Sequence, residues 1–286
     1  MITLDTRNLE NKGGMETLTN GLNHITGDVF RRVFTRTYTT RPSSEIEKMA
    51  YERYQAKPGF PYVSFRHAES LKLIYALKLA HRDSLTAAIF ESPRRPEFEA
   101  VVSNNRRMRD LRDKGYVNVY KVGRPASHCF SLTDLAFQYL RRKPYNTEFT
   151  PERMQQLLAV NTGFTELCRQ YRETHFLEWE TEPVIELDGG ENVWKPSAVA
   201  VVWKNRTKTE AEQAFIYETP KSVFLNDQLA EAERLADFYS QADVWKYFPV
   251  TPDLVLVNKD NHKKLTLFRN KERVATREDI RTWLGI

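Results

Sequence analysis

The chain has 286 residues, 41% hydrophobic and 12% aromatic, which is enough apolar material for one large or two ordinary domains. No run approaches the roughly 20 apolar residues that span a bilayer, and the first residues do not resemble a signal peptide, so we expect a cytoplasmic globular protein with no membrane partner. Two cysteines, Cys129 and Cys168, are too few for a disulfide framework, and we expect both to be buried thiols. The six histidines form no metal motif, so we predict neither a metal nor a cofactor.

The net charge of +5 is unevenly distributed along the chain. Residues 1–65 hold 9 basic and 7 acidic side chains, and residues 146–286 hold 18 and 23. Residues 66–145 hold 16 basic and 8 acidic side chains. This asymmetry predicts a polyanionic partner for the middle segment.

Residues 1–65 are expected to form an N-terminal arm and a lead-in helix. The first 44 residues show little periodicity, apart from an apolar helical face at 29–34. The arm is either a plain tail or a segment that places arginines on a nucleic-acid backbone or a partner subunit. Those arginines are Arg31, Arg32, Arg36 and Arg41. Helical spacing over 44–55 predicts the lead-in helix, which ends before KPGFPY.

Residues 66–145 show three helical patterns followed by a hairpin and a closing helix. The helices are expected in HAESLKLIYALKLA, in DSLTAAIFESP and in PEFEAVVSNNRRMRDLRDKGY, the last with Ser103 as a plausible N-cap and Gly115 as its stop. After Gly115 the apolar period changes to two, which predicts a hairpin over 116–132, and a helix follows from Thr133 or Asp134 to Leu140. This is the element order of a winged helix-turn-helix.

In a helix-turn-helix the second helix of the pair enters the major groove, where Asn pairs with adenine and Arg with guanine, while further basic side chains hold phosphates. The predicted helix contacts are Ser103, Asn104, Asn105, Arg106, Arg107, Arg109, Arg112 and Lys114. The predicted hairpin contacts are Lys121, Arg124, Ser127 and His128. Two alternatives stay open: a solvated helix face with pairs such as Arg106 with Asp110 and Arg109 with Asp113, or a protein-binding winged helix.

Residues 146–286 predict an α/β domain with a mixed sheet. A helix that begins at TPERM is followed by strand patterns in FLEWETEPVIEL, WKPSAVAVVWKN, EAEQAFIYETPKS and PDLVLVNKD, with one long helix before the last of them. The runs QQLLAVNTGFTELCRQYRETHFLEWETE, KPSAVAVV, AFIYET and FPVTPDLVLV resemble the replication-relaxation family of plasmid and conjugative-element proteins. The resemblance covers roughly 66–260. It implies a winged helix followed by a domain similar to the restriction-endonuclease fold, so we expect an α+β protein.

Active nucleases of that fold use acidic residues to bind Mg²⁺ and a lysine near the scissile phosphate. The resemblance places Glu180 and Glu218 at two acidic positions, but Ser197 stands where an aspartate is expected and Pro220 stands at the lysine position. Lys221 lies one residue further, and we expect it to point to the opposite face of the strand. We therefore expect no enzyme activity, and a Mg²⁺-dependent DNA nuclease is the alternative.

Aromatic residues are frequent in the C-terminal half, and a homodimer interface would bury part of their surface. They are Trp179, Trp194, Trp203, Phe215, Tyr217, Phe238, Tyr239, Trp245, Tyr247 and Phe248. An ordinary core is the simpler reading of the same residues. The expected function is sequence-specific binding of double-stranded DNA, by a replication initiator or transcriptional regulator of a plasmid or phage.

Overall fold

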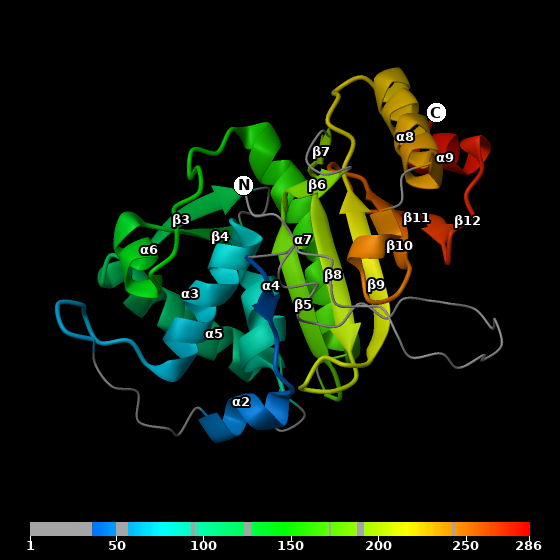
Figure 1. The fold of residues 1–286 in the computed structure, drawn as a ribbon. Helices are drawn as coiled ribbons and strands as arrows, with labels where there is room; N and C mark the ends of the chain where they lie inside the picture. Colours follow the sequence, from blue (N-terminus) through cyan, green and yellow to red (C-terminus); the bar gives the residue numbers. More distant parts are fainter. Residues whose placement is uncertain are drawn as a thin grey trace, which may run out of the picture.

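The structure is a computed structural model of the chain. It describes residues 36–49, 57–92, 95, 97–122, 127–171, 173–187, 192–241 and 244–286. A part rich in helices, with its own small sheet, lies beside a large mixed sheet with helices on both faces (Figure 1). The expected α+β class and the mixed sheet are therefore confirmed.

The N-terminal segment joins the large sheet. Strand β1 (Tyr38–Thr39) pairs antiparallel with β5, and Tyr38 lies opposite Trp179. Helix α2 (Ser43–Met49) follows, at the start of the predicted lead-in helix. The predicted apolar face at 29–34, Arg31 and Arg32 lie outside the described residues. Arg36 and Arg41 are the arm arginines that can be placed.

The middle segment forms the helical part and a three-stranded antiparallel sheet with the strand order β2-β4-β3. Its elements are α3 (Phe65–Leu77), β2 (Ala80–His81), α4 (Arg82–Leu85), a π-helix (Thr86–Phe90), α5 (Glu97–Asp113), β3 (Val117–Val122), β4 (Ser127–Leu132) and α6 (Asp134–Leu140). The predicted hairpin is confirmed, since β3 and β4 pair from Val117 opposite Leu132 to Val122 opposite Ser127.

Helix α5 has a different start from the predicted one. It begins at Glu97, so the predicted cap at Ser103 is wrong. The two acidic residues in its first turn suit the positive end of the helix dipole. Its end is as predicted, because Gly115 has a φ of +78°. The Gly115 and Tyr116 amides donate to the carbonyls of Arg112 and Leu111, which closes the last turn.

The C-terminal segment provides most of the large sheet. Its elements are α7 (Pro151–Tyr171), β5 (Phe176–Thr181), β6 (Ile185–Leu187), β7 (Asn192–Trp194), β8 (Ala198–Trp203), β9 (Ala211–Glu218), α8 (Leu225–Gln241), a 3-10 helix (Val244–Tyr247), β10 (Pro252–Val257), β11 (Lys264–Arg269), β12 (Glu272–Arg273) and α9 (Arg277–Leu284). The strand order is β1-β5-β8-β9-β10-β11-β12, and β9 and β10 form its parallel pair, connected through α8. The long helix predicted over residues 226–248 is shorter than expected, since α8 ends at Gln241.

The large sheet is buried on both faces, as the apolar run AVAVVW of β8 shows. Alternate residues of β8, such as Ala200, pack with α3 and α7, while their neighbours, such as Val201, pack with α8 and α9. The first cluster also contains side chains of the helical part, so α7 and α3 share one core. Among the described residues, no helix has both the length and the apolar character that crossing a bilayer requires.

The aromatic residues that suggested a homodimer fill the chain's own core. Trp179, Trp203, Tyr217, Tyr239 and Phe248 are buried, and the other five are partly buried against the two clusters. The aromatic argument for a dimer therefore fails. Dimerisation itself stays a prediction.

Candidate nucleic-acid interface

Helix α5 presents one exposed stripe to the outside of the helical part. Its residues recur every three or four positions, which places them on one face of the helix. The stripe consists of Phe98, Val102, Asn105, Arg109 and Arg112, with Arg106 exposed beside it. Phe98 is 78% exposed and Val102 is 51% exposed, so the stripe is apolar near the start of α5 and polar and basic from the middle onward.

Asn104 does not lie on this stripe, and its assignment as a DNA contact is wrong. Its side chain is fully buried on the face of α5 that also carries Met108 and Leu111. The Asn104 amide nitrogen donates to the Arg82 carbonyl and to the Thr86 hydroxyl, each at 2.9 Å. Asn104 therefore joins α5 to the preceding helix and cannot reach a base.

Three more predicted contacts are less accessible than expected. Ser103 is half-buried. Arg107 is also half-buried and donates to the Ser64 hydroxyl at 3.0 Å. The Lys114 ammonium donates to the Tyr62 carbonyl at 2.9 Å and to Asp110 at 2.7 Å. Arg107 and Lys114 thus hold the segment before α3 against α5.

The exposed arginines are not paired as a solvated helix face would pair them. Asp110 pairs with Lys114, and Asp113 pairs with Arg112. In the described part of the chain, Arg106 and Arg109 form no salt bridge. Their guanidinium groups are available to an external anion.

The hairpin adds two exposed side chains. Lys121 and His128 lie opposite each other in the β3–β4 pairing and are both exposed. Ser127 is half-buried, and Arg124 lies outside the described residues. Of the twelve predicted contacts, the exposed ones are Asn105, Arg106, Arg109, Arg112, Lys121 and His128.

The two acidic residues expected in a nuclease are both buried in the large sheet. Glu218, at the end of β9, accepts hydrogen bonds at 3.0 Å from the backbone amide and the hydroxyl of Ser197. Burial raises the pKa of Glu218 to about 7, although the two donors of Ser197 act in the opposite direction. Glu180 accepts from the Arg36 amide at 3.0 Å, and burial raises its pKa to about 7 as well.

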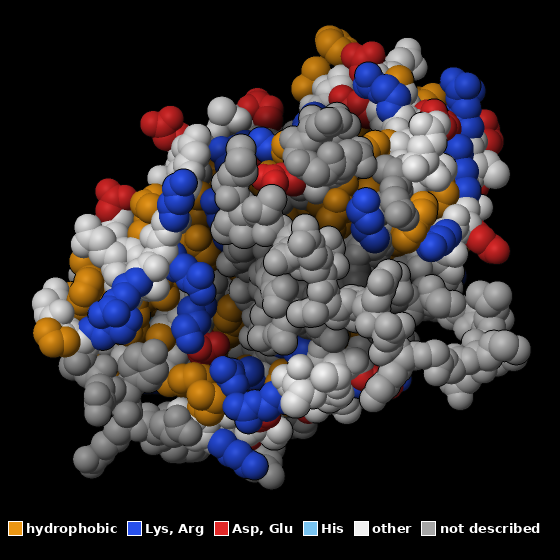
Figure 2. Space-filling model, in the orientation of Figure 1, with side chains coloured by type: hydrophobic (Ala, Val, Ile, Leu, Met, Phe, Trp, Pro, Cys, Tyr) orange, Lys and Arg blue, Asp and Glu red, His pale blue; other side chains and the backbone are white. Residues whose placement is uncertain are grey.

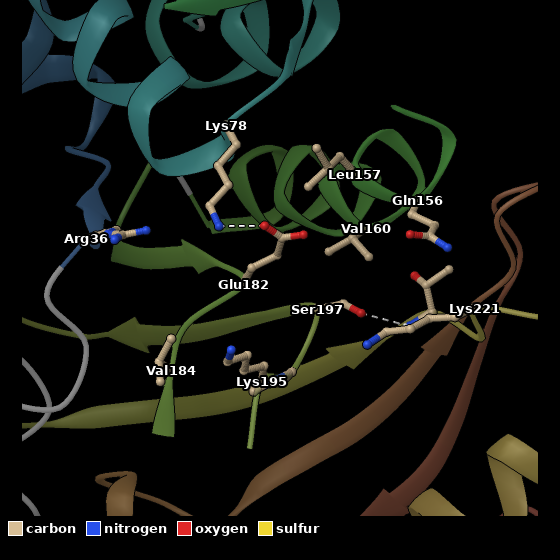
Figure 3. Close-up of a pocket in the computed structure, with 12 residues that line it drawn as sticks. Arg36, Lys78, Gln156, Leu157, Val160, Glu182, Val184, Lys195, Ser197 and Lys221 are labelled. Carbon is tan, nitrogen blue, oxygen red and sulfur yellow. Dashed lines mark hydrogen bonds and ion pairs between the residues drawn. The ribbon is translucent and has the colours of Figure 1, made fainter. Parts of the chain in front are cut away.

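A cavity of about 330 Å³ lies beside these carboxylates, between the end of α3, α7 and the loops that leave β5, β7 and β9 (Figure 3). Ser197 and Lys221 both line it. The expectation that Lys221 points to the opposite face of a strand is wrong, because β9 ends at Glu218 and strand alternation does not extend to residue 221.

Lys78 and Glu182 cross this cavity and connect the helical part to the sheet. The Lys78 ammonium lies 2.6 Å from the Glu182 carboxylate, and Figure 3 shows the two side chains pointing toward each other. Both residues have a positive φ, +60° for Lys78 and +49° for Glu182, which costs a non-glycine residue about 1–3 kcal/mol. Strained residues of this kind concentrate at functional sites. The sequence gives no signal for either conformation.

Within the described residues, no group of three His, Cys, Asp or Glu side chains is placed to hold a metal ion. Glu180 and Glu218 belong to no such group, and Ser197 supplies no third carboxylate beside Glu218. The chain matches no family model, no curated protein and no solved structure.

Proposed function

We propose that this protein binds double-stranded DNA through the exposed stripe of α5 and the β3–β4 hairpin. The observation that carries the proposal is the pair Arg106 and Arg109, exposed side by side without a salt bridge among the described residues. The charge of residues 66–145, which hold twice as many basic as acidic side chains, supports a polyanionic partner.

The order of the elements also supports a winged helix-turn-helix. The chain order is helix α3, short strand β2, the helical segment of α4 and the π-helix, helix α5, and the β3–β4 hairpin. Strand β2 pairs with β4 of the hairpin. In such modules the helix in the position of α5 enters the major groove, and the hairpin contacts the backbone. Lys121 and His128 are exposed on that hairpin.

We expect DNA to contact the middle of α5 rather than its first turn. Glu97 and Glu99 occupy the first turn and are exposed, so they repel phosphate groups. Asn105, Arg106 and Arg109 lie two to three turns later and offer amide and guanidinium donors to base edges or phosphates. Arg112, at the end of α5, is suited to the backbone.

The sequence resemblance adds a biological setting to this proposal. It implies a plasmid, phage or conjugative-element protein that acts in replication or in transcription, with the C-terminal domain as a scaffold similar to the restriction-endonuclease fold. The order α7, β5, β8, β9, α8, β10, with β10 parallel to β9, is compatible with that implication.

The test is a fluorescence-anisotropy titration of duplex DNA over a salt series. Arg106→Ala/Arg109→Ala is compared with Arg277→Ala/Arg281→Ala, which removes the same charge from exposed positions of α9. The α5 variant loses two phosphate contacts, so its log affinity should fall less steeply with log salt, by about 2 in the slope, and its binding should be at least tenfold weaker. The α9 variant keeps the wild-type slope. Equal behaviour of the two variants would refute the interface and favour a protein-binding winged helix.

A Mg²⁺-dependent nuclease is the alternative, and it has less support. By the resemblance, Ser197 stands where a nuclease has a metal-binding carboxylate. Its amide and hydroxyl both donate to the Glu218 carboxylate, so this second acidic group is already hydrogen-bonded within the protein. The discriminating observation is cleavage of duplex DNA that requires Mg²⁺ and is lost in Glu218→Ala. DNA that stays intact with bound wild-type protein supports the binding function.

A further inference from the structure

We propose that the cavity beside Glu218 binds a phosphate group of an external ligand, at a site separate from α5. The cavity opens between α3, α7 and the large sheet and is lined by both charged and hydroxyl side chains (Figure 3). Its cationic residues are Arg36, Lys78, Lys195 and Lys221, and Glu182 is the carboxylate among the lining residues.

The side chains that line the cavity carry an excess of positive charge, with four cations against one carboxylate. Glu182 is already paired with Lys78 at 2.6 Å and with Arg153 at 3.3 Å. Burial acts to raise the pKa of Glu182, but the two cations outweigh it and keep the pKa below the usual value. Within the described residues, Lys195 and Lys221 form no salt bridge. Both lysines line the cavity, are exposed and can turn toward an anion.

Thr219 supplies an independent observation that points to a ligand. Its side chain lines the cavity and is 4% exposed, yet its hydroxyl has no hydrogen-bond partner in the part of the chain that the structure describes. The adjacent Thr219 amide donates to the Ser197 hydroxyl at 3.1 Å. Buried hydroxyl groups are nearly always paired, and leaving one unpaired destabilises the fold. A phosphate oxygen in the cavity would accept from this hydroxyl and from the lysines.

A second basic cavity, of about 240 Å³, shares Arg36 with the first. Arg41, Lys72 and Arg142 also line it. Its carboxylate, Glu69, accepts hydrogen bonds from Tyr38 and Lys72. On the face seen in Figure 2, Lys and Arg side chains form a column that follows α3 toward α2. Continuous basic lining fits successive phosphates of one nucleic-acid strand better than a single small anion.

The experiment measures thermal unfolding and binding with three probes: pyrophosphate, thymidine monophosphate and a single-stranded DNA 12-mer. The variants are Lys195→Ala/Lys221→Ala and Thr219→Val, which keeps the side-chain shape and removes the hydroxyl. Lys246→Ala/Lys263→Ala removes the same charge from exposed lysines outside both cavities and serves as the control. Ionic strength is held constant with chloride, and sulfate is run in parallel, because phosphate-like salts stabilise folded proteins non-specifically.

We expect pyrophosphate to raise the Tm of wild type and of the control variant, and to bind Lys195→Ala/Lys221→Ala at least tenfold more weakly. Thr219→Val should unfold at a higher temperature than wild type without ligand, and it should lose most of the shift produced by pyrophosphate. Tighter binding of the 12-mer than of thymidine monophosphate identifies a nucleic-acid strand, whereas equal binding identifies a small phosphate ligand.

The proposal is overturned if none of the three probes binds, or if all variants respond to pyrophosphate as wild type does. Arg106→Ala/Arg109→Ala separates this site from the α5 interface: it should keep pyrophosphate binding while losing affinity for duplex DNA. A negative result with duplex DNA therefore does not contradict the phosphate site in the cavity, and a negative result with pyrophosphate does not contradict the α5 interface.

Discussion

The neighbouring residues Asn104 and Asn105 are predicted to have opposite effects when each is changed to alanine. Asn104 is fully buried and donates two hydrogen bonds of 2.9 Å to the segment before α5, whereas Asn105 is exposed on the stripe. Each hydrogen bond contributes a net ~1 kcal/mol, so Asn104→Ala should lower the free energy of unfolding by about 2 kcal/mol. Thr86 and Arg82 keep a hydrogen bond to each other, so no further polar group is orphaned.

The assay is urea unfolding followed by circular dichroism, combined with duplex-DNA titration under conditions where both variants are folded. With an m-value near 2 kcal/mol/M, Asn104→Ala should shift the midpoint down by about 1 M. Its DNA affinity should match wild type. Asn105→Ala should keep the wild-type midpoint and weaken DNA binding by ~1–3 kcal/mol. A variant Asn104→Ala with an unchanged midpoint and weakened DNA binding would refute the burial argument.

Two further predictions concern the large sheet. Because burial raises the pKa of Glu218 from 4.5 to about 7, the folded state holds a proton that the unfolded state releases, so stability should fall as pH rises through this window. Glu218→Gln should reduce the fall in Tm between pH 5 and pH 8, and an unchanged fall would contradict the assignment. Gly163→Ala adds a methyl group 2.8 Å from a ring carbon of buried Tyr217, so it should lower the Tm although alanine favours helices by ~1 kcal/mol. A Tm above that of wild type would show that the ring moves aside; combining Gly163→Ala with Tyr217→Leu should recover part of the loss.

The periodic elements were predictable because local patterns determine them. The change of apolar period after Gly115 predicted the hairpin, and the pattern in WKPSAVAVVWKN predicted the strand β8. Asn104 was misassigned because the helix start was placed seven residues late, at Asn104 after a cap at Ser103 instead of at Glu97. With α5 beginning at Glu97, the spacing of Ala100, Asn104 and Met108 puts Asn104 on the buried face.

Only the tertiary structure decided which charged residues face one another. Lys78 ends α3 and Glu182 follows β5, and their ion pair joins positions 104 residues apart. The cavity that they cross also collects Arg36, Lys195 and Lys221 from three other loops. The sequence by itself determined most of the helices and strands and the basic middle segment. It could not place these loops together, because periodicity describes neighbours along one element, while a site between elements depends on how their buried faces pack.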